Sequence, residues 1–114
     1  MKNVLAKVPI SKILKLDTLL VPIKNNEDDL QIIVTNYKKK IYAYLNSCPH
    51  DTRPLCKDPE YLWTKKKHLQ CMHHQALFNP QDGLCIKGPC EGDYLLKINT
   101  IQKNGELIFY KEGF

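Results

Sequence analysis

Short hydrophobic stretches separated by polar turns make up most of this chain. Residues 30–35 are rich in β-branched side chains, and residues 41–45 follow them after a lysine-containing turn at 36–40. Two such stretches joined by a polar turn predict an antiparallel hairpin, because β-branched and aromatic residues favour strands. A further strand is predicted at residues 19–23, before the polar turn at 25–29.

Two more turns indicate hairpins in the second half of the chain. The sequence Asn-Pro-Gln-Asp-Gly at residues 79–83 separates two short hydrophobic stretches, and these residue types are typical of tight turns. The dipeptide Asn104-Gly105 favours a two-residue type I′ turn. It lies between the hydrophobic stretches 95–101 and 106–110.

Helical periodicity is weak along the whole chain. One turn of helix is predicted at residues 58–63, where Pro59 suits the first helical position. The pattern as a whole therefore predicts an all-β protein with about eight to ten short strands.

The length and composition narrow the class of protein further. The chain has 114 residues and a mass of 13.2 kDa, which predicts a single domain over residues 1–114. Hydrophobic residues make up 43% and charged residues 25%, and these values argue against disorder. No hydrophobic stretch approaches the roughly 18 residues of a membrane helix, and the N-terminus lacks the features of a signal peptide. We therefore expect a cytoplasmic protein that does not bind membranes.

Lysine supplies nearly all of the positive charge. The chain has 17 basic and 12 acidic residues, for a formal net charge of +5, and Arg53 is its only arginine. Nucleic-acid-binding proteins rely on arginine for bidentate contacts, so we expect no nucleic-acid partner. Two lysine runs, at residues 38–40 and 65–67, predict either solvated turns or a docking surface for an acidic protein.

The middle of the chain contains the residue types that bind metals. All five cysteines, all four histidines and five of the seven prolines lie within residues 46–91. Cysteines grouped with histidines, in a chain without a secretion signal, indicate a metal site rather than disulfides. The sequence therefore predicts a β scaffold, formed by both ends of the chain, that holds a loop-rich metal-binding part at about residues 46–91.

Two short motifs in this part supply the candidate ligands. The first is Cys48-Pro49-His50 and the second is Cys71-Met72-His73-His74, with 20 residues between them. Two cysteines and two histidines suit either a structural zinc or an iron–sulfur cluster. A cysteine and a histidine only two residues apart are close for ligands of one metal ion. They suit a pair of iron atoms, because each residue can bind a different iron.

The paired motifs resemble those of Rieske-type [2Fe–2S] proteins. The resemblance extends from about residue 30 to the C-terminus, and it includes Phe78, Gly83 and the pair Gly88-Pro89 downstream of the second motif. Either motif alone would be a weak signal, whereas both motifs together with the Gly-Pro pair are specific.

The resemblance implies a role for each candidate ligand. Cys48 and Cys71 are expected to bind the inner iron of the cluster. His50 and His74 are expected to bind the outer iron and to face the solvent. Replacing two thiolates by two imidazoles makes such a cluster easier to reduce. His73 is then a loop residue that does not bind the cluster.

The resemblance also implies the fold and the function. The fold is an antiparallel β sandwich or barrel with a loop-rich cluster-binding subdomain, in which a loop containing Gly88-Pro89 covers the cluster. The implied function is that of a soluble, low-potential ferredoxin with one [2Fe–2S] cluster per chain. Such a protein is a one-electron carrier and not an enzyme. As a monomer, it passes electrons from a reductase to the terminal oxygenase of a dioxygenase system, or to a similar acceptor.

Two other functions remain open at this point. The chain could be the small Rieske subunit of a multi-subunit oxidoreductase, which copurification with a large subunit would reveal. It could also be a Cys₂His₂ zinc module with a structural role. The zinc module leaves the Gly-Pro pair and the turn at Gly83 unexplained.

The chain departs from the Rieske pattern in both ligand loops. Gln75 and Thr52 stand where family members have glycine, a residue that permits positive φ and close backbone approach. The segment between the motifs is also long, with extra residues at about 57–67 that include Trp63. This insertion is expected either to pack beside the cluster loops or to contact a partner.

The hydrogen-bond donors of high-potential Rieske proteins are missing. Those proteins have a serine and a tyrosine hydroxyl where this chain has Ala76 and Phe78. With fewer hydrogen bonds, the more negative reduced cluster is less stabilised. The resemblance therefore predicts a potential near the low end of the Rieske range, about −150 mV.

Three cysteines have no place in the cluster. Cys85 and Cys90 lie on either side of the Gly-Pro pair, and we predict that they are small buried side chains. Cys56 lies in the first loop and is a candidate for an exposed thiol.

Overall fold

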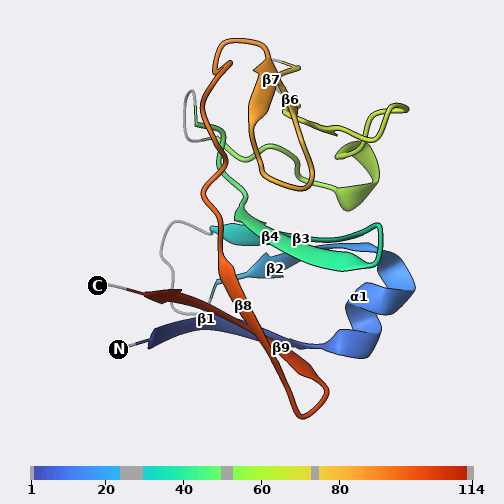
Figure 1. Cartoon of the computed structure of the whole chain (residues 1–114), viewed down its shortest axis with the longest axis vertical. Coiled ribbons are helices and arrows are strands. Elements are labelled where there is room, and N and C mark those ends of the chain that lie inside the picture. The colour runs from blue at the N-terminus through green and yellow to red at the C-terminus, as the bar shows by residue number, and fades with distance from the viewer. Residues whose placement is uncertain (1, 24–29, 50–52, 73–74, 113–114) are drawn as a thin grey trace.

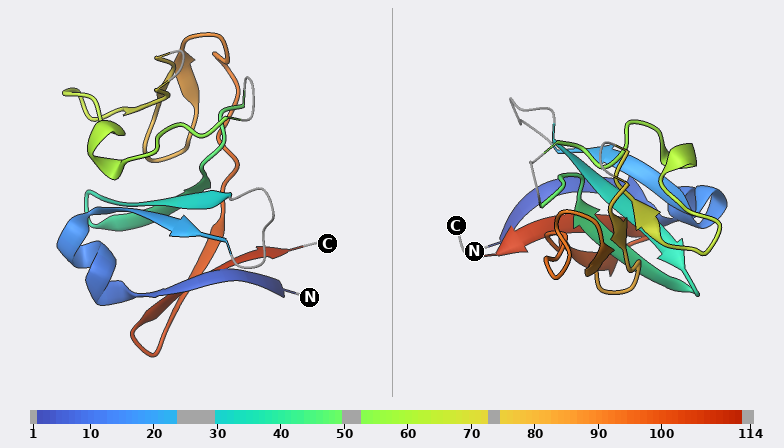
Figure 2. Two further views of the ribbon diagram at one scale, coloured as in Figure 1. Left: turned by 180° about the vertical axis from the view of Figure 1, so that it is seen from behind. Right: turned by 90° about the horizontal axis from the view of Figure 1, so that it is seen from above.

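A computed structural model describes residues 2–23, 30–49, 53–72 and 75–112 of the chain. Its described residues form three antiparallel sheets of three strands each. The sheets are stacked along the longest dimension of the molecule (Figures 1 and 2). The predicted all-β fold and the predicted number of strands are therefore confirmed for the described part of the chain.

The first sheet joins the two ends of the chain. Its strand order is β1-β9-β8, and the strands are β1 (Lys2–Pro9), β8 (Asn99–Lys103) and β9 (Glu106–Glu112). Asn104 and Gly105 both have positive φ, 52° and 77°, which confirms the predicted type I′ turn between β8 and β9.

The second sheet contains the predicted hairpin. Its strands, in the order β2-β3-β4, are β2 (Thr18–Pro22), β3 (Gln31–Tyr37) and β4 (Lys40–Leu45). The side chains of Ile32 and Val34 pack into one hydrophobic core with Leu107 and Phe109, whereas Ile33 packs into a second core. Because the middle sheet is covered on both faces, its central strand has consecutive buried hydrophobic residues.

The third sheet is small and lies at the end of the molecule that carries the ligand motifs (Figure 1). Its strands, in the order β5-β6-β7, are β5 (Leu69–Gln70), β6 (Leu77–Phe78) and β7 (Cys85–Lys87). The 3₁₀ helix η1 (Pro59–Tyr61) precedes it, with Pro59 at its N-terminal end. The predicted helical turn is confirmed, although it is one turn of 3₁₀ helix.

The N-terminal helix α1 (Ile10–Leu16) was not predicted from the sequence. It has seven residues, of which only Ile13 is fully buried, and no side chain caps its N-terminus. One buried position cannot produce a detectable helical period. The helix ends at Asp17, which has a left-handed conformation with φ of 62°, and tertiary contacts rather than propensity maintain it.

The third sheet and the loops that carry the candidate ligand motifs make up the ligand-bearing end of the molecule. Tyr44 on β4 connects the middle sheet to this end. Its hydroxyl donates a buried hydrogen bond of 2.8 Å to the carbonyl oxygen of Pro80. A Cβ atom on Gly83 would lie 2.9 Å from the Tyr44 ring, so the turn at residues 79–83 needs glycine there. Burial, and secondarily the charge of Asp82, raises the pKa of Tyr44 and keeps its hydroxyl protonated as a donor.

Candidate metal centre

The first ligand loop begins directly after β4. Cys48 is buried, with 1% of its surface exposed, and its backbone N–H donates a 2.7 Å hydrogen bond to the carbonyl oxygen of Arg53. This bond closes a loop of six residues, 48–53. His50 and Thr52 lie outside the described residues, so the prediction that His50 is a ligand is not tested.

Asn46 holds this loop in place, and sequence reasoning missed its role. It is one of only two buried polar side chains among the described residues. Its side-chain oxygen accepts hydrogen bonds from the backbone N–H groups of Leu55 at 2.8 Å and Cys56 at 3.4 Å. Its amide nitrogen donates to the carbonyl oxygen of Cys56 at 2.9 Å. One side chain therefore connects the start of the loop to its end.

The second ligand loop has the same construction. Cys71 is fully buried, and its backbone N–H donates to the carbonyl oxygen of Ala76 at 2.9 Å. The Cys71 carbonyl oxygen accepts from the N–H of Gln75 at 2.9 Å. In both loops, the N–H of a buried cysteine therefore bonds to the carbonyl five residues later. His73 and His74 lie outside the described residues, so the choice of His74 as ligand stays a prediction.

Two further contacts bring the loops around the candidate centre together. The N–H of Met72 donates to the carbonyl oxygen of Leu55 at 2.7 Å, which joins the second loop to the first. The loop that contains Gly88 and Pro89 is the third loop of this end of the molecule. Gly88 lies directly against the second loop, because a Cβ atom on Gly88 would come within 2.9 Å of the Cα and Cβ atoms of Ala76. The side chains of Cys48 and Cys71 belong to the same buried core.

The described donors fit the inner side of a [2Fe–2S] site. Cys48 and Cys71 are buried thiols at equivalent positions of two matching loops, and thiolates are the ligands that iron–sulfur clusters use. Within the described residues, no three cysteine, histidine or acidic side chains are arranged to hold a metal ion. Both predicted imidazole donors lie outside those residues, so this absence does not bear on the four-ligand set.

The three remaining cysteines are also buried and form no disulfide. The burial predicted for Cys85 and Cys90 is confirmed, and the exposure considered for Cys56 is wrong, because 1% of its surface is exposed. Burial, followed by the charges of Asp58 and Cys71, raises the pKa of the Cys56 thiol to about 11. Cys56 is therefore a protonated side chain of the core.

Gln75 follows the second motif directly, at the position where the Rieske pattern has glycine. It adopts a left-handed conformation with φ of 53°, and its side chain is exposed. Glycine adopts this conformation without the steric cost that a side chain brings.

We expect Gln75→Gly to increase the free energy of unfolding by about 0.5–1 kcal/mol, measured as a higher midpoint in thermal unfolding of the cluster-loaded protein. The exposed Gln102→Gly in β8 should instead lower the midpoint, and an equal decrease in both variants would contradict this account.

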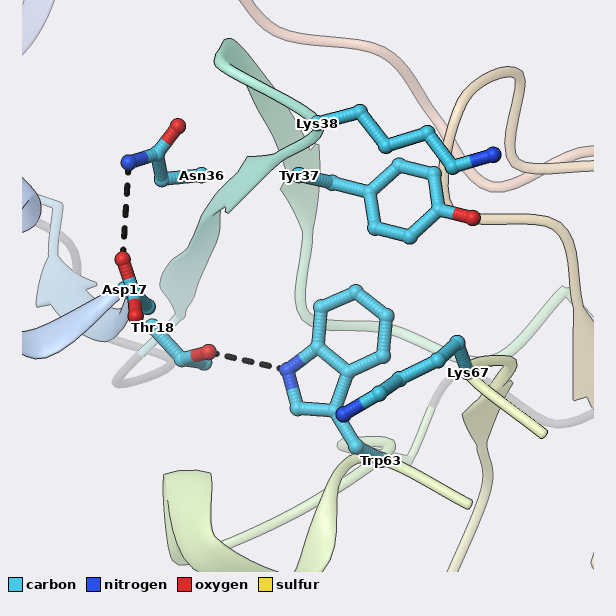
Figure 3. A pocket seen from close by; sticks show the side chains of 7 residues that line it. All are labelled: Asp17, Thr18, Asn36, Tyr37, Lys38, Trp63 and Lys67. Carbon is cyan, nitrogen blue, oxygen red and sulfur yellow. Dashed lines mark hydrogen bonds between the residues drawn. The ribbon is translucent and has the colours of Figure 1, made fainter. Parts of the chain in front are cut away.

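The insertion packs on the β3–β4 hairpin. The Trp63 ring stacks on the Tyr37 ring with centroids 5.8 Å apart, and its indole N–H donates to the Thr18 hydroxyl at 2.9 Å. The amine of Lys38 lies 5.3 Å from the centre of the Tyr37 ring. These groups and Lys67 line an open pocket of about 480 Å³ (Figure 3). The fold therefore brings one lysine from each of the two lysine runs to the same pocket.

Comparisons with known proteins agree with this architecture. The sequence matches the family model for the Rieske [2Fe-2S] domain over residues 7–102. A comparison with curated protein sequences found no match. None of the helices in the described part of the chain has the length and hydrophobicity needed to span a lipid bilayer.

Several solved structures have the same fold at low sequence identity. The ferredoxin of carbazole 1,9a-dioxygenase from Nocardioides aromaticivorans IC177 is 14% identical, with a TM-score of 0.64, and the match covers 94% of this chain and 96% of that chain. A chain from a complex of reduced oxygenase and oxidised ferredoxin in carbazole 1,9a-dioxygenase is 18% identical, with a TM-score of 0.65 and coverage of 95% and 91%.

A larger protein contains the same fold as one part. The terminal oxygenase of carbazole 1,9a-dioxygenase from Novosphingobium sp. KA1 is 9% identical, with a TM-score of 0.64, and the match covers 95% of this chain but 29% of that chain. Because the family match extends over residues 7–102, and the three-sheet fold places two buried cysteines in matching loops, this chain belongs to the Rieske [2Fe-2S] domain family.

Proposed function

We propose that this protein is a one-electron carrier whose cluster is held by the two matching loops. The proposed ligands are Cys48, His50, Cys71 and His74. The observation that carries the proposal is the repeated loop construction, in which a buried cysteine is fixed by a hydrogen bond to the carbonyl five residues later. Membership of the Rieske family supports the same ligand set.

The surrounding residues have two tasks in such a carrier. A bound [2Fe–2S] cluster takes up and releases one electron, and its potential depends on charge, hydrogen bonds and solvent exposure. The core around Cys48 and Cys71, which includes Leu55 and Leu69, excludes water from the cysteine side. The proposed histidine ligands, His50 and His74, then provide the route by which the electron passes to a docked partner.

The proposed partners are an electron-donating reductase and a terminal oxygenase or similar acceptor. A ferredoxin of a dioxygenase has the same fold over nearly its whole length, which supports a carrier over an enzyme. We propose that the chain acts in the cytoplasm as a monomer with a single domain, in which residues 46–91 are the cluster-binding part.

A second candidate function is that of a Rieske unit within a larger oxidoreductase. The likeness to 29% of a terminal oxygenase chain favours it, because the same fold can serve as one part of an enzyme. Size-exclusion chromatography of the protein from its native source distinguishes the two. A free carrier elutes near 13.2 kDa, whereas a subunit copurifies with a large partner.

Electron paramagnetic resonance tests the cluster and its ligands. Protein purified without air should show a Rieske-type signal with couplings to histidine nitrogen after reduction with dithionite. His74→Gln should abolish the signal, whereas the matched change His73→Gln should leave it intact. A colourless protein with stoichiometric zinc would refute the carrier function, and loss of the signal in His73→Gln alone would refute the ligand choice.

The lysines around the Trp63 pocket form a candidate docking surface for an acidic partner protein. Lys38 and Lys67 are exposed and lie on the same pocket. If they attract an acidic partner, the rate of electron transfer with the cognate reductase should fall as salt increases. Lys38→Glu with Lys67→Glu should lower that rate by roughly tenfold at low salt, and Lys103→Glu at the far β8–β9 turn should not. A rate that ignores both salt and charge reversal would refute docking at this surface.

A further inference from the structure

Two cysteine sulfurs lie in contact at the two ends of the third loop. The Cys90 thiol donates a hydrogen bond of 2.9 Å to the sulfur of Cys85, and the Cys85 thiol donates to the carbonyl oxygen of Lys87 at 3.3 Å. A disulfide bond is roughly 2.05 Å long, so the two sulfurs need to approach by only about 0.9 Å to form one. Neither cysteine is a proposed ligand of the cluster.

Backbone hydrogen bonds hold the two cysteines in this arrangement. The N–H of Cys85 donates to the carbonyl oxygen of Asp93 at 2.8 Å, and the Cys85 carbonyl oxygen accepts from the N–H of Gly92 at 2.9 Å. The Cys90 carbonyl oxygen accepts from the N–H of Asp93 at 2.8 Å. Both cysteines are therefore bound to the same two residues, and the contact between their sulfurs is a property of the closed loop.

The loop that carries Cys90 is otherwise exposed. Of residues 87–93, only Cys90 is buried, with 2% of its surface exposed, and the other six residues are exposed. A segment with so few buried contacts opens locally at a lower free-energy cost than the core of a protein. Local opening of this segment brings the Cys90 thiol to the solvent, where a small reagent can reach it.

We propose that Cys85 and Cys90 form a reversible disulfide in reaction with a low-molecular-weight disulfide such as oxidised glutathione. The Cys90 thiolate attacks one sulfur of the reagent, releases one small thiol and forms a mixed disulfide. The Cys85 thiolate then attacks the Cys90 sulfur and releases the second small thiol. The two cysteines lose two protons and two electrons, and the reagent is reduced to two thiols.

The disulfide would close the third loop on itself. The closed ring would contain residues 85–90, and Gly88 within it lies against Ala76 of the second ligand loop. Disulfides in reducing compartments are usually transient and respond to redox conditions, which suits a bond that forms and breaks with the supply of oxidant. The proposal goes beyond the electron-carrier function, because it involves none of the proposed cluster ligands.

A peptide map of the cluster-loaded protein tests the disulfide. The protein is incubated without air in oxidised or in reduced glutathione and is then denatured in N-ethylmaleimide, which blocks the remaining thiols. Trypsin cleaves after Lys87 and places the two cysteines in separate peptides, residues 68–87 and 88–97. We expect the two peptides to be joined after treatment with oxidised glutathione and to be separate after treatment with reduced glutathione.

Three controls identify the bond. Further cleavage by chymotrypsin after Phe78 distinguishes a bond through Cys85 from one through Cys71, which lies in the same tryptic peptide. Cys85→Ser should lower the amount of joined peptide by at least about tenfold. The matched change Cys56→Ser, at another buried cysteine, should leave that amount unchanged.

The wild-type map decides the proposal even if Cys85→Ser does not fold. Separate peptides after treatment with oxidised glutathione would overturn the proposal. A bond from Cys90 to any cysteine other than Cys85, or a mixed disulfide with glutathione as the only product, would also overturn it. The Rieske signal is measured on the same samples and reports the cluster, so failure of the carrier function is told apart from failure of the disulfide.

Discussion

Replacing Gly88 by alanine should destabilise the ligand-bearing end by about 3 kcal/mol. Gly88 has a φ of 111°, a conformation that residues with a Cβ rarely adopt. The added methyl group would also lie 2.9 Å from both the Cα and Cβ atoms of Ala76. One of these atoms belongs to the backbone of the second ligand loop, so the clash cannot be relieved by turning a side chain. The third loop would have to move away from the second.

The expected result of Gly88→Ala is a fall in the melting temperature of the cluster-loaded protein by roughly 10–15 °C. Thermal unfolding followed by visible absorbance and by circular dichroism measures it. Gly92→Ala is the matched control, because Gly92 has a similar φ of 93° but no atom within 4 Å of an added Cβ. Backbone strain alone costs about 1–2 kcal/mol, so Gly92→Ala should have the smaller effect. Equal effects of the two variants would show that contact with Ala76 is unimportant.

Replacing Asn46 by alanine should have an effect of similar size, about 3 kcal/mol. The change removes three hydrogen bonds at once, to the N–H groups of Leu55 and Cys56 and to the Cys56 carbonyl oxygen. These backbone groups lie in the core, where an unsatisfied polar group costs about 1–3 kcal/mol. Because Asn46 joins both ends of the first ligand loop, we also expect faster loss of the cluster from this variant.

Chemical denaturation and the rate of cluster bleaching with a chelator measure these two effects. The control is Asn99→Ala, because Asn99 is an exposed asparagine at the start of β8, in the first sheet and outside the first ligand loop. Asn99→Ala should change the free energy of unfolding by no more than about 0.5 kcal/mol, and it should leave the bleaching rate unchanged. If Asn46→Ala lowered stability but left the bleaching rate unchanged, its role in holding the first ligand loop would be wrong.

The central features of the fold could be predicted from the sequence because they depend on neighbouring residues. The β3–β4 hairpin follows from β-branched residues on both sides of a polar turn, and the β8–β9 turn follows from Asn104-Gly105. In the same way, the paired ligand motifs and the Gly-Pro pair were enough to indicate the Rieske family. The ligands His50 and His74 stay a prediction, since both lie outside the described residues.

Other features could not be predicted, because they are contacts between distant parts of the chain. Helix α1 has one fully buried residue and therefore no detectable period. The site where the insertion packs depends on Trp63 meeting Tyr37 and Thr18, residues that are 26 and 45 positions away. Neither contact leaves a pattern in the local sequence.

The sequence by itself determined most of the strands, the turns, the family and the residue types that can bind a [2Fe–2S] cluster, since each follows from local propensity or a short motif. Strands β1 and β5 were not predicted. Only the tertiary structure decided how the loops support those ligands. It placed Asn46 across the first loop, Gly88 against the second loop and Cys90 beside Cys85. These arrangements depend on how three separate loops pack against one another, and close packing is a property of the folded chain as a whole.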